Sequence, residues 1–266
     1  MNPKTIYQIS INLNDDLDDL KQSHERLMQL NPGWEYFKIT SEHQMIEFMQ
    51  QHFRDSPNPR DNKIYECYNE VDDLINGLAN SVKTDEVIKS GDITRRDELV
   101  CISRLVCRTD IFRLATVYKF GGFYFDLSKQ LEMNIDKVFD DYEVGFFRCD
   151  HEVHNSVLYS RHPRSEYFAK LTDMMIKSFE LKRNNLMILA GPGLYTASFG
   201  VMPVKHIPHS LHFDDPKINV ISTHESHIQQ MDIVFKFRAP WKRKLHTPVN
   251  GKQINEHWLL YPDKQL

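Results

Sequence analysis

Strand-like segments alternate with helical segments along most of this sequence, and that alternation limits the fold more than any other feature. Residues rich in β-formers occur at 5–11, 34–39, 123–125, 144–147, 156–160 and 218–221. Apolar residues at helical spacing occur between them, at 15–30, 41–53, 95–120 and 165–181. The pattern predicts an α/β fold with an open, mostly parallel sheet flanked by helices on both faces. Ligands of such folds bind beyond the carboxyl ends of the strands.

Residue patterns at several segment boundaries predict where helices begin or end and where the chain turns. Ser41 and Gln44 have the spacing of a capping box at a helix start. The stretch 95–120 is long enough for two helices with a break near Arg108 and Thr109, and the glycines at 121–122 should end it. Residues 54–95 are poorly patterned, which suggests a helical insertion. Residues 191–193 (Gly-Pro-Gly) read as a turn.

Composition excludes some classes of function. The net charge of −4 and the pI of about 6.3 give no overall basic field for nucleic acid. The triplet at 242–244 (Lys-Arg-Lys) is either a solvated face or a contact with phosphate or a membrane surface. The four cysteines lack Cys-x-x-Cys spacing and read as reduced thiols. With no signal peptide or apolar span in the sequence, we expect a cytoplasmic protein, with peripheral contact at the inner face of a membrane as an option.

One segment carries the elements of a reactive site. Asp110 and Arg113 share a helix face if residues 95–120 are helical. The glycines at 121–122 then allow a sharp turn, and the following strand ends at Asp126. A carboxylate at a strand end can hold Mg²⁺ or Mn²⁺, which bridges the phosphates of a nucleotide diphosphate. The alternative is a surface ion pair next to an ordinary helix stop.

The segment resembles the glycosyltransferases of family 32 and the related large clostridial toxin glucosyltransferases. These share a (Ser/Thr)-Asp-x-x-Arg segment, a helix, and then Gly-Gly-x-Tyr-x-Asp-x-Asp, the last part being the DXD motif. Residues 109–113 (TDIFR) and 121–126 (GGFYFD) match that spacing. Further similarity lies at 2–9 (NPKTIYQI), 31–36 (NPGWEY) and 190–193 (AGPG), so the resemblance covers roughly residues 3–200.

The resemblance implies a single GT-A-type domain over residues 1–266, with the tail at 240–266 closing over a sugar donor. It implies that Asp110 and Arg113 grip the sugar hydroxyls and the diphosphate, and that Asp126 is the first aspartate of the metal motif. It places Tyr7 near the nucleotide base. The other implied donor-binding residues are Gln8, Ile9, Gly122, Tyr124 and Trp258.

The metal motif departs from the family pattern, because Ser128 stands where the second aspartate is expected. A hydroxyl is a weaker metal ligand than a carboxylate, so the affinity for Mn²⁺ or Mg²⁺ should fall. Asp126, Ser128 and a tail residue, His257, could together hold the ion, or the enzyme could work with weak metal binding or none. The protein could also be a donor-binding pseudoenzyme.

The resemblance implies transfer of a hexose or amino sugar from a UDP- or GDP-sugar to a hydroxyl acceptor, as in glycan or polysaccharide biosynthesis. It also implies retention of the anomeric configuration. Two alternatives stay open: the pseudoenzyme just named, and a structural or adaptor protein in which the Gly-Gly strand is only part of the core.

Overall fold

The structure is a computed structural model that describes residues 2–11, 18–79, 96–127, 129–131, 133–149, 151–205, 208–222 and 235–236. Several expectations lie outside these residues. They concern Ser128, the basic triplet at 242–244, and the tail at 240–266 with His257 and Trp258.

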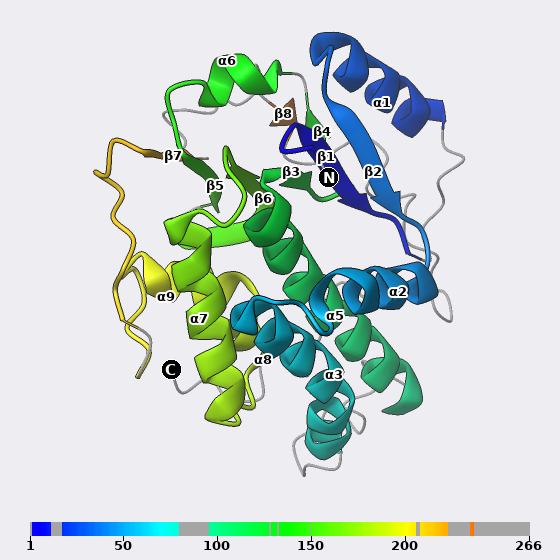
Figure 1. Ribbon diagram of the computed structural model, residues 1–266, viewed down its shortest axis with the longest axis vertical. Coiled ribbons are helices and arrows are strands. Elements are labelled where there is room, and N and C mark those ends of the chain that lie inside the picture. Colours follow the sequence, from blue (N-terminus) through cyan, green and yellow to red (C-terminus); the bar gives the residue numbers. More distant parts are fainter. Residues whose placement is uncertain are drawn as a thin grey trace.

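Six strands form the central sheet, in the order β2-β1-β3-β6-β5-β7 (Figure 1). They are β1 (Thr5–Ile9), β2 (Glu35–Ile39), β3 (Gly122–Phe125), β5 (Val144–Cys149), β6 (Glu152–Ser160) and β7 (Ile218–Ser222). The pairs β1–β2, β1–β3 and β5–β7 are parallel, whereas β6 runs antiparallel to both of its neighbours. Two short strands, β4 (Gln130–Leu131) and β8 (Phe235–Lys236), pair separately. The expected α/β class with a mostly parallel sheet is confirmed.

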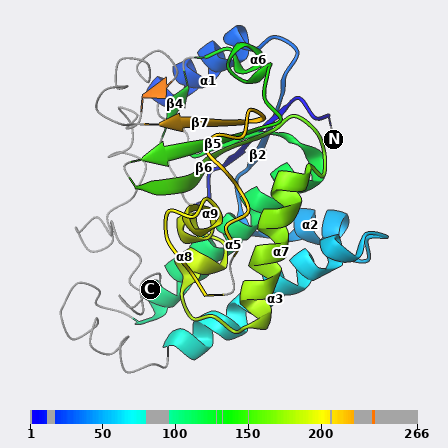
Figure 2. The ribbon, with the colours of Figure 1, turned by 90° about the vertical axis from the view of Figure 1, so that its left-hand side faces the viewer.

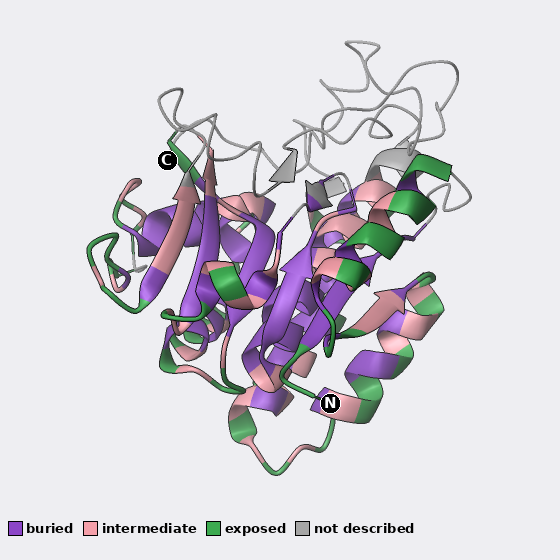
Figure 3. Ribbon diagram, turned by 90° about the horizontal axis from the view of Figure 1, so that it is seen from above, coloured by how far each residue is buried: buried purple, intermediate pink, exposed green. Residues whose placement is uncertain are grey.

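Helices cover both faces of the sheet, as expected (Figures 1 and 2). One face packs against α1 (Asp18–Leu30) and α6 (Ile135–Phe139). The other face packs against α2 (Glu42–Phe53), α3 (Pro59–Ala79), α5 (Arg96–Phe120), α7 (Glu166–Glu180), α8 (Leu186–Leu189) and α9 (Pro192–Ser198). The sheet is buried between these layers, while the outer surfaces of the helices carry the exposed residues (Figure 3).

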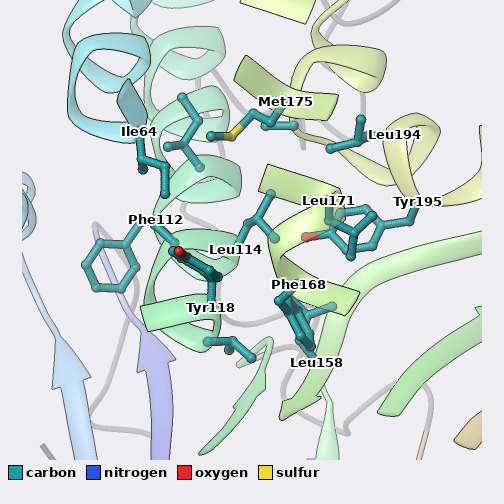
Figure 4. Close-up of a cluster of buried hydrophobic side chains, with 14 of the residues drawn as sticks. Ile64, Phe112, Leu114, Tyr118, Leu158, Phe168, Leu171, Met175, Leu194 and Tyr195 are labelled. Carbon is teal, nitrogen blue, oxygen red and sulfur yellow. The ribbon is translucent and has the colours of Figure 1, made fainter. Parts of the chain in front are cut away.

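Strand periodicity divides the core into two clusters. In β3, Phe123 and Phe125 join the cluster beneath α1 and α6, whereas Tyr124 between them joins the larger cluster on the opposite face. Successive side chains of a strand point to opposite faces, so a strand buried on both sides is apolar throughout. The larger cluster continues between α5, α7 and α9, where Leu114, Phe168 and Tyr195 lie close together (Figure 4).

Helix α5 corrects one expectation, because it is continuous through Arg108 and Thr109 rather than broken there. The Arg108 side chain is largely buried and makes ion pairs with Glu42 of α2 (2.6 Å) and Asp72 of α3 (2.9 Å). The polar residue that suggested a break therefore joins three helices. The expected stop after the helix is confirmed, with Gly121 at φ +71.

The poorly patterned stretch at 54–95 is described only as far as residue 79. There α3 packs along α5, and its residues Ile64, Tyr68, Val71 and Ile75 are buried in the larger core cluster. At the start of α2, the Ser41 hydroxyl accepts a hydrogen bond from the Gln44 N–H (3.1 Å). The Gln44 side chain accepts from the Thr40 N–H (2.9 Å), one residue before the position expected for a capping box.

Candidate active site

Asp126 follows β3 directly, at the carboxyl end of the strand. Strand β3 lies parallel to β1, with Tyr124 opposite Tyr7. The chain passes from β1 to β2 on one side and returns to β3 on the other, so the strand order reverses here. Such a switch point is where open α/β sheets bind ligands. The Asp126 N–H donates to the carbonyl of Ser156 in β6 (2.9 Å), which fixes the backbone of the aspartate.

Arg113 links Asp126 to Asp110. Its Nη1 donates to Asp126 Oδ1 (3.0 Å) and its Nη2 lies 2.9 Å from Asp110 Oδ1. The Tyr124 hydroxyl donates to the same Asp126 oxygen (2.8 Å), and the guanidinium lies over the Tyr124 ring at 5.1 Å. Asp110, Arg113 and Asp126 are therefore joined by direct contacts.

Asn155 in β6 is a fourth polar member that sequence reasoning missed. Its Nδ2 donates to Asp110 Oδ1 (2.9 Å), and its backbone carbonyl accepts from Arg113 Nη1 (3.2 Å). The β5–β6 register shifts at this point, from Phe147 opposite His154 to Phe146 opposite Leu158. Bulges re-aim side chains next to functional sites, and this one places Asn155 against α5. The sequence gives no separate signal for Asn155, because the strand also carries Glu152, His154, Ser156 and Ser160.

The members of this group differ in exposure. The side chains of Asp110 and Arg113 are only 6% and 9% exposed, whereas that of Asp126 is 30% exposed. Asp126 is therefore the member that a ligand can reach. Both terminal nitrogens of the Arg113 guanidinium contact carboxylates, so in this structure Asp110 and Arg113 hold the Asp126 carboxylate in place. The expectation that they grip the sugar hydroxyls and the diphosphate stays a prediction.

Burial controls the titration of this group. Loss of hydration raises the pKa of Asp110 to about 6, against the opposing effects of the Arg113 charge and the Asn155 hydrogen bond. Burial also raises the pKa of Tyr124, so its hydroxyl stays protonated and keeps donating to Asp126.

The raised pKa of Asp110 predicts a change of stability with pH. Between pH 4 and 6 the folded protein holds a proton on Asp110 that the unfolded chain has released. This stabilisation is complete below about pH 4 and is lost as the pH rises through 6. The free energy of unfolding of the wild type, minus that of Asp110→Asn, should therefore fall across this window and level off above it. Urea denaturation at a series of pH values measures the difference, and a difference that does not change with pH would contradict the assignment.

Gly191 allows the α8–α9 connection to approach Asp110. A Cβ at this position would lie 3.1 Å from Asp110 Oδ2 and 3.0 Å from the Met187 Cα. Gly191 caps α9, with Pro192 in its first turn. The expected Gly-Pro-Gly turn is thus the start of a helix, which places this backbone against the carboxylate.

Substitution of Gly191 tests this close approach. Gly191→Ala should push on Asp110 and on the α8 backbone, with a loss of roughly 1–3 kcal/mol in the free energy of unfolding. Gly77→Ala in α3 is the matched control, because nothing lies within 4 Å of its Cβ position. The control should be neutral or stabilising by up to about 1 kcal/mol. Chemical denaturation compares the two, and equal effects would contradict the prediction.

Three residues expected at the donor, Tyr7 and Ile9 of β1 and Gly122 of β3, are buried. Tyr7 is fully buried in the core, and burial raises the pKa of its hydroxyl to about 12. Gly122 lies at the opposite end of β3 from Asp126, against the Thr5 carbonyl and the Tyr7 ring. Ile9 is also a core residue. Tyr124 holds the Asp126 carboxylate through its hydroxyl, whereas the role of Tyr7, Ile9 and Gly122 at a donor stays a prediction.

Gln8 does lie near the end of β1 that adjoins the site. Its Oε1 accepts a hydrogen bond from the Tyr36 hydroxyl, and the residue lines a small hollow between α1 and the sheet. The hollow also contacts Phe125 and Lys129, the residues on either side of the turn that contains Asp126.

The described residues offer one carboxylate oxygen to a metal ion. Asp126 Oδ1 accepts two hydrogen bonds, but no described residue donates one to Oδ2. A carboxylate oxygen is a ligand that Mg²⁺ and Mn²⁺ favour. Within the described ranges, no group of three His, Cys, Asp or Glu side chains could enclose an ion. The residues fit an ion held by one protein carboxylate oxygen, with other ligands coming from water or substrate.

Comparison with protein families identifies the segment that contains this site. Residues 18–145 match the model of the family described as "Glycosyltransferase sugar-binding region containing DXD motif". The match covers 128 of the 266 residues, a little under half of the chain. This region includes α1, the Asp110–Arg113 pair of α5 and the Asp126 turn, whereas Asn155 and Gly191 lie outside it.

Comparison with solved structures gave neighbours of low similarity. "PaToxG Glycosyltransferase" is 16% identical over 75% of this chain and 69% of that chain, with a TM-score of 0.44. The "ligand-free glycosyltransferase domain from the YGT toxin" is 12% identical over 67% of this chain and 63% of that chain, with a TM-score of 0.33. This chain thus spans less than two thirds of the second neighbour. A search of curated protein sequences found no match.

None of the helices in the described ranges is both long and apolar enough to cross a lipid bilayer.

Proposed function

We propose that this sugar-binding region transfers a hexose or amino sugar from a UDP- or GDP-sugar to a hydroxyl group of a glycan acceptor. The observation that carries the proposal is the Asp126 carboxylate, which is 30% exposed at the switch point of the sheet and held by Arg113 and Tyr124 through one oxygen. Its second oxygen accepts no hydrogen bond from a described residue. The resemblance of residues 109–113 and 121–126 favours retention of the anomeric configuration.

The described side chains around Asp126 hold its carboxylate in a fixed position. Tyr124 and Arg113 fix the Asp126 carboxylate before a donor arrives, and Asp110 with Asn155 fixes Arg113. Prearranged polar groups of this kind accelerate transfer because they need not reorganise as charge develops. A divalent ion bound at Asp126 would neutralise charge on the diphosphate leaving group.

A thermal-shift screen of UDP- and GDP-sugars, with and without Mn²⁺, tests the proposal. A donor present at 100 times its dissociation constant should stabilise the native state by about 2.7 kcal/mol, which corresponds to a rise in Tm of roughly 5–10 °C for a chain of this size. Transfer itself would be followed as release of the nucleoside diphosphate. If no nucleotide-sugar shifts the melting temperature, the proposal is wrong and a structural or adaptor function is favoured.

The donor-binding pseudoenzyme is the second candidate, and Ser128 is the observation that favours it, because it removes a carboxylate from the metal motif. The two candidates differ in turnover. A transferase should slowly hydrolyse its bound donor even without acceptor, whereas a pseudoenzyme should show the same thermal shift and return the donor intact. Chromatography of the nucleotide after prolonged incubation with Mn²⁺ separates the two.

A further inference from the structure

Tyr195 of α9 is a fully buried tyrosine near the Asp110–Arg113 pair. Its exposed fraction is 0%, and its ring packs edge-on against Phe146 of β5, with the ring centres 6.3 Å apart. Figure 4 shows the side chain extending from α9 into the larger core cluster. No described residue forms a hydrogen bond with its hydroxyl. Burial of a hydroxyl without a hydrogen bond costs free energy, so this group calls for a partner.

Two features direct the Tyr195 hydroxyl toward Arg113. Tyr195 lies one helical turn after Gly191, so the two share a face of α9, and Gly191 packs against the Asp110 carboxylate. Charges of the site also act on the hydroxyl, because Asp110 adds to the rise of its pKa that burial causes, and Arg113 opposes that rise. Helix α9 is itself fixed to the sheet, since the Thr196 hydroxyl accepts a backbone N–H of β6 (3.0 Å).

Arg113 has a matching group without a partner. Its two terminal nitrogens contact Asp110, Asp126 and Asn155, whereas its third nitrogen, Nε, is buried and forms no hydrogen bond with a described residue. An arginine Nε–H can only donate, and a tyrosine hydroxyl can both donate and accept. A water molecule is the smallest ligand that can accept from Nε and also bond to the hydroxyl. Buried waters typically link polar groups of this kind.

We propose that Tyr195 is a positioning residue for Arg113, and that one internal water joins the Tyr195 hydroxyl to Arg113 Nε. The water restrains the guanidinium at Nε, while the carboxylates of Asp110 and Asp126 hold its terminal nitrogens. Tyr195 thereby helps to fix the Asp126 carboxylate without contacting a ligand. The effect on sugar transfer rests on the proposed function, whereas the link between Tyr195 and Arg113 does not.

Tyr195→Phe tests the link through its effect on stability, because it removes the hydroxyl and keeps the ring. Loss of a hydroxyl that has no partner should raise the melting temperature, whereas loss of one that is joined to Arg113 leaves a buried donor unsatisfied. We expect the melting temperature to fall by about 3–8 °C. Tyr159→Phe, in the smaller core cluster on the opposite face of the sheet, is the control and should change it by less than about 2 °C.

Two further measurements separate a link to Arg113 from general packing. In the Arg113→Met/Asp110→Asn background, Tyr195→Phe should change the melting temperature by less than about 2 °C, because the partner of the hydroxyl is gone. In the wild type, NMR should show a cross-peak between a long-lived water and the Arg113 Nε–H, a resonance assigned by its loss in that background. Tyr195→Phe should remove the cross-peak and lower turnover roughly 3- to 30-fold, because Asp126 is held less firmly.

Each outcome decides the assignment. A loss of stability confined to the protein that contains Arg113, together with the cross-peak, supports it. A raised melting temperature of Tyr195→Phe, an equal loss in both backgrounds, or a wild-type Arg113 Nε–H without a water cross-peak overturns it. Wild-type turnover of Tyr195→Phe overturns the positioning role. The stability and NMR measurements need no donor, so they decide the link to Arg113 even if no nucleotide-sugar binds and the proposed function fails.

Discussion

Asp126→Asn should lower sugar transfer by roughly 10²- to 10³-fold while leaving the fold intact, the size of effect seen when one prearranged electrostatic contact is removed. The amide keeps the shape of the carboxylate and can still accept from the Tyr124 hydroxyl. It loses the charge that faces Arg113 and that would hold a cation. Turnover with the donor from the thermal-shift screen, followed as nucleoside diphosphate release, measures the effect.

Asp136→Asn provides the control for this substitution. Asp136 is 43% exposed in its side chain and pairs with Lys4 across the surface. Such pairs contribute about 0–1 kcal/mol to stability, so the control should retain wild-type turnover and nearly wild-type stability. If Asp126→Asn also kept full turnover, Asp126 could not be the residue on which transfer depends, and the site would have to lie elsewhere.

Arg113→Met should lower the free energy of unfolding at pH 7 by about 3–5 kcal/mol, because it leaves the Asp110 carboxylate buried without a cation. Turnover should fall as well, since Asp126 loses the group that holds it. Urea denaturation measures the first effect. Arg60→Met is a suitable comparison, because the Arg60–Asp173 pair is much more exposed and its loss should cost less than about 1 kcal/mol.

The double variant Arg113→Met/Asp110→Asn distinguishes charge from packing. Removal of both buried charges takes away the uncompensated carboxylate, so the double variant should be more stable than Arg113→Met alone. Turnover should stay low in both, because neither holds Asp126 by an ion pair. Equal stability of the single and double variants would show that the loss comes from packing around the arginine stem rather than from the unpaired Asp110.

The predicted losses of stability and of activity involve the same three side chains, Asp110, Arg113 and Asp126. Asp110 and Arg113 are buried, so their substitution is expected to affect the folded state directly. Asp126 is partly exposed, so its charge is available to a ligand. This division explains why the aspartate is the better target for a loss of activity and the arginine the better target for a loss of stability.

The sequence by itself determined the fold class and the core of the site. Periodicity separates strands from helices, because a strand repeats every two residues and a helix every 3.6. The spacing of residues 109–113 and 121–126 put Asp110 and Arg113 on one helix face and Asp126 at the end of a strand. These positions follow from local backbone geometry, so the sequence alone predicts them without knowledge of any tertiary contact.

Only the tertiary structure decided how far each expected side chain is buried. Tyr7 and Gly122 belong to segments that resemble the family, and the pairing of β1 with β3 buries Tyr7 and places Gly122 at the end of β3 opposite Asp126. Asn155 contacts Asp110 and Arg113 because the register of β6 against β5 shifts at this point. Exposure and long-range contact depend on elements far apart in the chain, so no local pattern could specify them.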